Sequence, residues 1–199
     1  MPAAVLIPIK AFHDAKVRLA GTLTQPDRAA LAQQMAATVI AAAHPLPVFV
    51  VCDDQAVAEF TIEHHGEVIW CPSRGLNGAV TDGVGYLADA GFDQVIVSHA
   101  DLPMARELAW VADFDGVTIV PDRHKDGTNV MCVPTSSKFE FAYGPASFHQ
   151  HSAEAARLGL ALRVVHDSNL GHDIDHPDDL AQLNRHPLHT EGVADLELS

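Results

Sequence analysis

The stretch Gln94-Val95-Ile96-Val97-Ser98-His99-Ala100-Asp101-Leu102-Pro103 decides the fold of this chain. Its apolar residues follow one another without alternating with polar ones, which is the pattern of a strand buried on both faces. Such strands belong to parallel sheets that helices cover on both sides. Because Pro103 cannot continue a central strand, we expect the strand to end before it and Asp101 to follow its carboxyl end. The stretch therefore predicts an α/β fold.

The carboxylate of Asp101 allows two interpretations. Ligands of open α/β sheets bind outside the carboxyl ends of the strands, so an acid at that place is suited to chemistry. Asp is also favoured just before a helix, and Pro is favoured in the first turn, so Asp101 could instead cap a helix. Other parts of the chain must decide between the two.

Length and composition are those of one globular domain. The chain has 199 residues, of which 48% are hydrophobic and 19% charged, enough for one sizeable core. We place the domain at residues 1–185 and a polar tail at 186–199. No apolar run has the length of a membrane span, and the first residues lack the pattern of a signal peptide. We therefore expect a cytoplasmic protein without a membrane partner.

The charge of the chain is strongly acidic. Twelve basic and 26 acidic residues give a net charge of −14, which repels polyanions and speaks against nucleic acid as a partner. Four of the basic residues nevertheless fall within the first 28 positions, and none lies between 29 and 73. The three cysteines show no paired metal-ligand spacing, and we expect no disulfide.

The chain alternates between predicted strands and helices. Strands are expected over residues 4–9, 48–52, 67–71, 94–98, 117–121, 130–133 and 161–166, and helices over 26–43, 55–65, 79–91, 107–111, 149–158 and from 177 onward. This order predicts a doubly wound sheet.

A long loop, residues 10–24, follows the first predicted strand and carries Lys10, Lys16 and Arg18. Loops of this length in a compact domain are usually functional. In a doubly wound fold, the phosphates of a nucleotide lie after the first strand. The loop therefore predicts a phosphate site, with a solvated basic turn as the alternative.

Three further segments could contact a ligand. Asn77 stands between glycines, where its amide could meet a base or a ribose. The polar segment 122–129 offers the Thr128 hydroxyl and backbone N–H groups as an oxyanion cradle, although a plain Asp-Gly hairpin explains it as well. Gly144 and Ser147 precede a predicted helix, where Ser is often only a cap.

A second acidic group lies near the end of the chain. Asp173 and Asp175 are two residues apart, so in an extended segment both carboxylates point the same way. Together with Asp101 and the cationic loop they indicate a magnesium nucleotide reaction, because Mg²⁺ takes one or two protein carboxylates and fills its other positions with phosphate oxygens and water. His172 and His176 make a zinc site the rival interpretation, but no strict ligand spacing is present.

The residues that carry a resemblance to a known family run through the chain in one order: Ile7-Pro8-Ile9-Lys10, Ala15-Lys16-Val17-Arg18-Leu19-Ala20, Gly75-Leu76-Asn77, Ala100-Asp101-Leu102-Pro103, Pro121-Asp122-Arg123, Asp126-Gly127-Thr128-Asn129, Tyr143-Gly144-Pro145-Ala146-Ser147-Phe148 and Asp173-Ile174-Asp175. Over roughly residues 5–181 the chain resembles the CofC/FbiD guanylyltransferases of coenzyme F-420 biosynthesis. The resemblance implies a single-domain Rossmann-like nucleotidyltransferase fold of the GT-A-like kind, with a mostly parallel mixed sheet and helices on both faces. The related molybdenum-cofactor guanylyltransferases carry a Gly-rich loop where this chain has residues 10–19.

The resemblance also implies an activity, which is the transfer of GMP from GTP to the phosphate of phosphoenolpyruvate or 2-phospho-L-lactate. Pyrophosphate would leave, and the product would be enolpyruvyl- or lactyl-diphospho-5'-guanosine. By matching motifs, it implies catalytic roles for Asp101, Asp173 and Lys16, Mg²⁺ held by Asp101 and Asp173 with Asp175 beside them, GTP contacts from Lys10, Lys16, Arg18 and Asn77, and binding of the phosphorylated three-carbon acid by Thr128, Gly144 and Ser147.

Two other functions stay open. One is a nucleotidyltransferase with a different nucleotide or acceptor, such as 3-phosphoglycerate, because the sequence does not read the identity of the base or the acid. The other is a non-catalytic nucleotide-binding regulator that kept the fold. A homodimer is one of the assemblies that the sequence permits.

Overall fold

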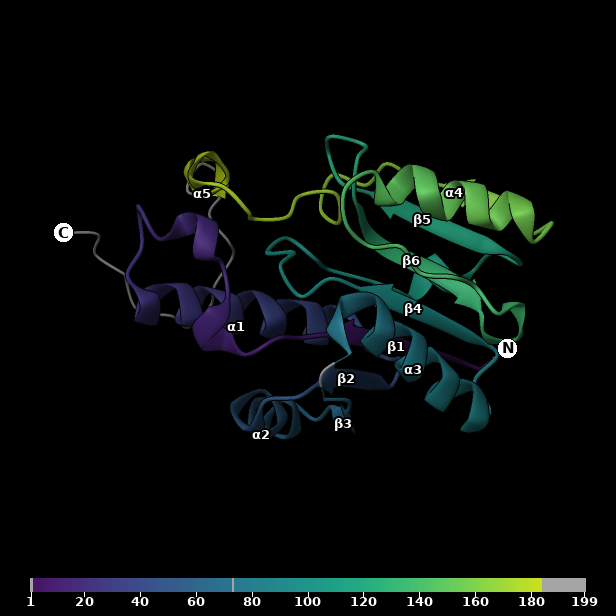
Figure 1. Cartoon of the computed structure of the whole chain (residues 1–199), viewed down its shortest axis with the longest axis horizontal. Coiled ribbons are helices and arrows are strands. Elements are labelled where there is room, and N and C mark those ends of the chain that lie inside the picture. The colour runs from purple at the N-terminus through teal and green to yellow at the C-terminus, as the bar shows by residue number, and fades with distance from the viewer. Residues whose placement is uncertain (1, 73, 184–199) are drawn as a thin grey trace.

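The computed structural model describes residues 2–72 and 74–183. A single sheet runs through it (Figure 1), with seven strands in the order β3-β2-β1-β4-β6-β5-β7. The strands are β1 (Ala3–Pro8), β2 (Val48–Cys52), β3 (Glu67–Trp70), β4 (Gln94–Ser98), β5 (Val117–Pro121), β6 (Thr128–Pro134) and β7 (Leu162–Val164). β6 is antiparallel to β4 and β5, and the other neighbours are parallel. The predicted mostly parallel mixed sheet is therefore confirmed.

Helices cover both faces of the sheet (Figure 1). The elements are α1 (Gln25–Ala42), α2 (Gln55–Glu63), α3 (Gly75–Asp89), α4 (Ser147–Arg157) and α5 (Pro177–Leu183), with short 3-10 helices η1 (Phe12–Asp14), η2 (Val17–Leu19), η3 (Ala109–Ala112) and η4 (Thr135–Ser137). α1, α2 and η3 pack on one face, and α3 and α4 pack on the other. None of the helices in the described ranges is long and apolar enough to cross a membrane.

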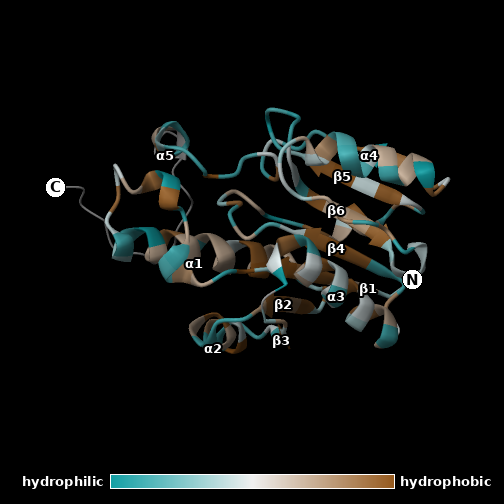
Figure 2. Ribbon diagram, in the orientation of Figure 1, coloured by the Kyte–Doolittle hydropathy of each residue, from teal (hydrophilic) through white to brown (hydrophobic). Residues whose placement is uncertain are grey.

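The unbroken apolar run of β4 places side chains in the hydrophobic cores on both faces of the sheet. Ile96 packs into the core under α1 and α2, whereas Val95 and Val97 pack into the core under α3 and α4. All three side chains are fully buried. Figure 2 shows the central strands as the most hydrophobic part of the fold. The first prediction from the sequence, a strand covered on both faces, is thus confirmed.

The loop over residues 10–24 folds against the C-terminal part of the described chain. Leu19 of η2, Met35 of α1 and Ile174 form a separate small core, against which Leu180 of α5 also packs. In Figure 1 this loop, in purple, and α5, in yellow, lie together beyond the carboxyl ends of β1 and β4. Segments from the two ends of the chain therefore meet at the edge of the sheet where ligands of this fold class bind.

Several element boundaries differ from the prediction. α3 begins at Gly75, which adopts φ +62°, so Asn77 lies in the first helical turn and not in a loop. The helix expected at 107–111 is the 3-10 helix η3, and β7 is shorter than 161–166 because only three of its residues pair with β5. The tail predicted at 186–199 lies outside the described residues, so the domain boundary at 185 stays a prediction.

The effect of an added Cβ at Gly116, just before β5, can be compared with its effect at Gly85, where no atom lies nearby. Gly116 has φ +149°, and an added Cβ would lie 2.4 Å from the carbonyl oxygen of Ala161. Gly116→Ala should lower the free energy of unfolding by about 1–3 kcal/mol, since it adds backbone strain and a clash. Gly85 is exposed in α3 with nothing near its Cβ position, so Gly85→Ala should raise that free energy by about 0.5–1 kcal/mol. Urea unfolding of both variants measures the contrast, and equal values would contradict it.

Candidate active site

An open cavity of about 560 Å³ lies at the carboxyl ends of β1 and β4. β1 pairs with β2 on one side and with β4 on the other, so this is the point at which the strand order reverses. The cavity lining includes Lys10 after β1, Lys16 and Arg18 from the N-terminal loop, His99 and Asp101 after β4, and Asp175. Crevices at such points are the usual ligand sites of doubly wound sheets.

Lys16 joins two acids from distant parts of the chain. Its Nζ donates to Asp101 Oδ2 at 2.5 Å and to Asp175 Oδ1 at 3.0 Å, across 85 and 159 residues of sequence. Arg18 Nη1 donates to Asp175 Oδ2 at 2.9 Å, and the N–H of Ile174 donates to the carbonyl oxygen of Asp101 at 3.3 Å. The two acidic segments therefore converge on the cationic loop.

Three groups of this cluster have shifted pKa values, and the shifts differ in direction. Burial would lower the pKa of Lys16, but Asp101 and Asp175 outweigh that effect and raise it, so Lys16 is charged. Burial would likewise raise the pKa of Asp101, but the charge of Lys16 lowers it overall. The pKa of Asp173 is raised by burial and then by the negative charge of Asp101. No ion pair of the Asp173 carboxylate is found within the described residues, and it accepts a 3.4 Å hydrogen bond from Asn129 Nδ2.

These acids fit a divalent cation that arrives with other ligands. In the part of the chain that the structure describes, Asp101 Oδ1 is buried without a hydrogen-bond partner, and a cation beside it would also favour the charged form of Asp173. Among the described residues no group of three or more His, Cys, Asp or Glu side chains is arranged around a metal position. Mg²⁺ needs only one or two protein carboxylates when phosphates and water complete its shell, so the arrangement favours it over a metal bound by protein alone.

Beyond β4, Thr128 and Ser147 are connected by buried hydrogen bonds. The N–H of Thr128 donates to Ser147 Oγ at 3.0 Å, and Thr128 Oγ1 lies 3.0 Å from Nδ1 of His151. The N–H of Ala142 donates to His151 Nε2, so Nδ1 carries the hydrogen and donates to Thr128. Burial, with a smaller effect of His99, lowers the pKa of His151 to about 4 and keeps it neutral. No pattern in the sequence predicts a role for this histidine.

Residues 122–129 were expected to offer N–H groups to an oxyanion, but several of these groups donate hydrogen bonds within the protein. The segment is the hairpin between β5 and β6, and the Asp122 carboxylate accepts the N–H groups of Asp126 and Gly127 at 3.0 Å. Asp126 in turn accepts the N–H of Ala146 at 3.2 Å. Thr128 is 0% and Ser147 2% exposed, whereas Gly144 is exposed with φ +135°. Of the expected acid-binding residues, Gly144 is the one that faces solvent.

Comparison with known proteins decides the family. The family model described as "Guanylyl transferase CofC like" matches residues 3–195. The chain belongs to this family. A phosphoenolpyruvate guanylyltransferase from Roseiflexus castenholzii is 31% identical over 193 residues, which cover 96% of this chain and 91% of that protein. A 2-phospho-L-lactate guanylyltransferase from Methanothermobacter thermautotrophicus is 30% identical over 207 residues, with 97% and 87% covered.

The fold of this CofC-like protein also occurs in solved structures. A protein described as a nucleotide-diphospho-sugar transferase, from Desulfovibrio desulfuricans G20, has a TM-score of 0.77 over 96% of this chain and 90% of that chain. Its sequence is 15% identical, so the likeness concerns the fold alone. It agrees with the predicted nucleotidyltransferase type of fold.

Asn77 has a structural contact that the CofC-like resemblance did not imply. Its Nδ2 donates to the carbonyl oxygen of Tyr143 at 3.2 Å, and its Oδ1 accepts the N–H of Tyr143 at 2.7 Å. The amide thereby ties α3 to the turn that precedes α4. Contact of Asn77 with a nucleoside stays a prediction, as do the phosphate contacts of Lys10 and Arg18.

Arg123 and Asp179 hold the acidic segment of the CofC-like protein in place, and sequence reasoning missed this. Asp179 is 2% exposed, and its Oδ2 accepts the N–H groups of Asp175 and His176 at 2.8 and 2.7 Å. Arg123 Nη2 donates to Asp179 Oδ1, and Nη1 donates to the carbonyl oxygen of Asp173 at 3.5 Å. Asp179 lies in the first turn of α5, where the helix dipole alone favours a carboxylate, whereas its partner Arg123 is 56 residues away in the sequence.

Proposed function

We propose that this CofC-like protein transfers GMP from GTP to the phosphate of phosphoenolpyruvate or 2-phospho-L-lactate, in coenzyme F-420 biosynthesis. The observation that carries the proposal is the meeting of Asp101 and Asp175 at Lys16, in the crevice between β1 and β4. The two acceptors are those named for the relatives from Roseiflexus and Methanothermobacter.

In this reaction an oxygen of the acid's phosphate attacks the α-phosphorus of GTP, a new P–O bond forms, and the bond to pyrophosphate breaks. The phosphate is ionised at neutral pH, so no residue has to remove a proton. The work of the protein is to align the two phosphates and to offset their charge. Lys10, Lys16 and Arg18 line the cavity and would contact the phosphates.

Asp101 and Asp173 would hold Mg²⁺, with Asp175 beside them. The ion, when bound, supplies positive charge to the phosphate oxygens around the reacting phosphorus. Asp175 would orient the loop that carries the cations, because it accepts a hydrogen bond from Lys16 in that loop. The acid would bind on the far side of β4, toward Gly144. A cytoplasmic location and a homodimer stay predictions.

An assay of pyrophosphate release tests the proposal. Purified protein is incubated with Mg²⁺, one of GTP, ATP or CTP, and one of phosphoenolpyruvate, 2-phospho-L-lactate or 3-phosphoglycerate. We expect release with GTP and a 2-phosphorylated acid, and none without the acid. Release only with 3-phosphoglycerate, or only with another nucleotide, would show that the substrates differ from those proposed. If the protein binds GTP but releases no pyrophosphate in any combination, the proposed enzyme activity is wrong and a nucleotide-binding regulator is the better interpretation.

Asp179→Asn tests the support of the acidic segment. Asn keeps the size of Asp but loses the charge that Arg123 contacts, and it can accept fewer hydrogen bonds. We expect a loss of about 1–3 kcal/mol in the free energy of unfolding and a fall of about 10- to 100-fold in turnover. Asp178→Asn is the matched control, because Asp178 is exposed in the same helical turn. Equal turnover of both variants would show that the Arg123–Asp179 pair does not support the site.

A further inference from the structure

Two buried hydroxyls accept hydrogen bonds, but no acceptor for their own hydrogens is found within the described ranges. Ser147 Oγ accepts the N–H of Thr128 at 3.0 Å, and Thr128 Oγ1 lies 3.0 Å from Nδ1 of His151. Thr128 and Ser147 are almost fully buried. Because buried polar groups are normally paired, two O–H donors left over in one place indicate a bound group that accepts hydrogen bonds.

The hydrogen bond between Thr128 and His151 has a defined direction. The N–H of Ala142 donates to His151 Nε2 at 2.9 Å, so Nε2 carries no hydrogen. A neutral imidazole holds one hydrogen, which is therefore on Nδ1 and is donated to Thr128 Oγ1. The Thr128 hydroxyl is thereby fixed as an acceptor on the side of the ring, and its own hydrogen has to point elsewhere.

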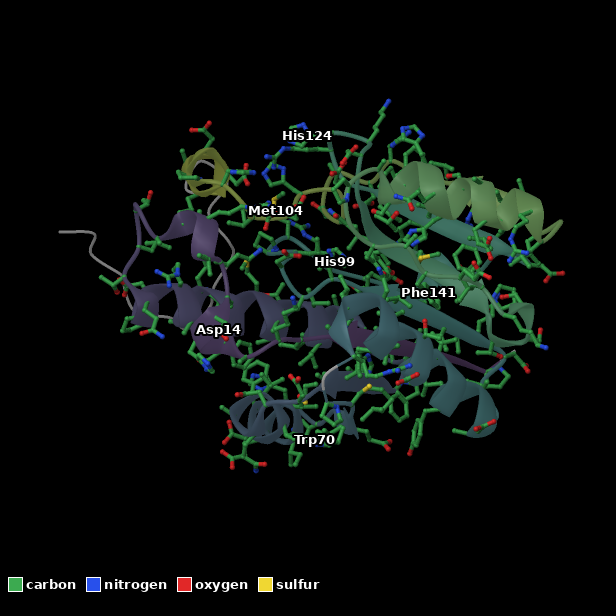
Figure 3. The ribbon with its side chains drawn as sticks, in the orientation of Figure 1. Asp14, Trp70, His99, Met104, His124 and Phe141 are labelled. Atoms are coloured by element: carbon green, nitrogen blue, oxygen red, sulfur yellow. The ribbon has the colours of Figure 1, made fainter. Side chains whose placement is uncertain are left out.

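The surroundings of His151 keep its ring neutral and in place. The residue is fully buried, and burial, with a smaller effect of His99, lowers its pKa to about 4. Glu154, one turn further along α4, favours the charged ring, but its carboxylate also accepts hydrogen bonds from Arg157 at 2.6 and 2.7 Å. Three aromatic rings pack around that of His151, with centroids 5.9, 6.4 and 4.8 Å away: Phe139, Phe141 (labelled in Figure 3) and Tyr143.

The two free O–H groups suit an anion. The phosphate and the carboxylate of the acid substrate are ionised at neutral pH and accept hydrogen bonds. Ser147 follows the exposed turn at Gly144, and its N–H donates to the carbonyl oxygen of Gly144 at 3.1 Å. The hydroxyls therefore lie beside the turn toward which the acid would bind, with their acceptor sides already occupied by the protein.

We propose that His151 is a positioning residue for the acid substrate: its Nδ1–H holds the Thr128 hydroxyl in the orientation in which the O–H donates to the anion. This role rests on the proposed guanylyl transfer. His151 does not touch the substrate itself and acts through Thr128. The donor arrangement is then built before the acid arrives, so that binding does not have to order it.

His151→Phe removes both ring nitrogens and keeps the shape of the ring. Without the Nδ1 donor the Thr128 hydroxyl is free to turn, and its hydrogen is no longer reserved for the substrate. Loss of an oriented hydrogen bond to a charged group predicts a rise of about 10-fold in KM for phosphoenolpyruvate, with KM for GTP unchanged. His149→Phe is the matched control, because His149 is exposed on the same helix, and it should change neither KM.

His151→Asn separates positioning from packing. Asn is smaller than His, but its amide N–H lies near the position of Nδ1 and can still donate to Thr128. We therefore expect its KM for the acid to be closer to that of the wild type than the KM of His151→Phe is. A role in packing alone predicts the opposite order, since Phe fills the space of the ring and Asn leaves a cavity. That order would overturn the proposal.

A double-mutant cycle tests whether His151 acts through Thr128. Thr128→Val keeps the shape of the side chain and the N–H that Ser147 accepts, but it lacks the hydroxyl. In this background His151→Phe should have no further effect on KM for the acid, whereas an equal rise in both backgrounds would contradict the proposal. The wild type offers a test without substitution at His151: nitrogen NMR of the ring should place its hydrogen on Nδ1, and a hydrogen on Nε2 would overturn the assignment.

Calorimetric titration of phosphoenolpyruvate without nucleotide separates this inference from the proposed function. If the wild type is active and His151→Phe binds the acid as tightly as the wild type, the positioning role is wrong and the guanylyl transfer stands. If the wild type releases no pyrophosphate, the proposed function fails, and the same titration decides the inference. Weaker binding by His151→Phe than by the wild type would support it, and equal or undetectable binding by both would overturn it.

Discussion

Asp101→Asn should reduce GMP transfer by about a thousandfold or more while the protein remains folded. The substitution keeps the size of the side chain but removes the negative charge that attracts Lys16 and would hold Mg²⁺. It also places a neutral amide where a carboxylate oxygen is buried without a hydrogen-bond partner among the described residues. Loss of one preorganised charged group at a reacting phosphorus typically costs two to three orders of magnitude in rate, and here the same group serves both the metal and the cationic loop.

Pyrophosphate release at saturating GTP and acid measures this loss, and thermal unfolding followed by circular dichroism checks the fold. Asp14→Asn is a suitable control, because Asp14 lines the same cavity but is exposed and pairs only with His13 among the described residues (Figure 3). Turnover by Asp101→Asn close to that of the wild type would remove Asp101 from the mechanism.

Lys16→Met should have two effects of opposite sign. GMP transfer should fall by about a hundredfold or more, because a cation next to the phosphates is lost. Binding of Mn²⁺ in the absence of nucleotide should become about tenfold tighter or more, because Asp101 and Asp175 lose the internal cation that now offsets their charge. Lys16 is only 9% exposed, and the unbranched side chain of Met preserves most of its packing.

Mn²⁺ binding is followed by the electron paramagnetic resonance signal of the free ion, and turnover is followed by pyrophosphate release. Lys10→Met is the matched control: Lys10 lines the cavity but forms no ion pair within the described ranges. Lys10→Met should raise KM for GTP and leave the affinity for Mn²⁺ unchanged. An unchanged Mn²⁺ affinity in Lys16→Met would mean that the lysine does not compete with the metal for the acids.

The sequence predicted the parts of the fold that depend on local pattern. β2 and β5 have the expected bounds, and β4 ends before Asp101 because the apolar run stops there and Pro103 follows. Asp101 follows the carboxyl end of β4, the edge at which ligands of this fold class bind. Asp175 lies well beyond the end of β7 and reaches Lys16 through the loop that follows that strand, a contact that local pattern does not predict.

The remaining features depend on partners that sequence patterns do not reveal. Nothing near Asp179 in the sequence indicates Arg123, and nothing near Thr128 indicates His151. The pattern of residues 122–129 predicts hydrogen-bond donors for an anion, but it does not reveal that acceptors within the protein, such as Asp122 and Asp126, already bind several donors of this region. The glycines that flank Asn77 predict a loop, whereas Gly75 begins α3 and places Asn77 in its first turn.

β6, the strand that opposes its neighbours in direction, has a consequence for engineering. Its amino end lies at the same edge as the carboxyl ends of β1 and β4, and there Thr128 meets Ser147. The lining of the cavity comes instead mainly from the segments that follow β1 and β4. A chimera that receives residues 121–148 from a relative would therefore keep every residue that lines the cavity, and its acceptor preference and its nucleotide preference can be measured as two separate properties of the graft.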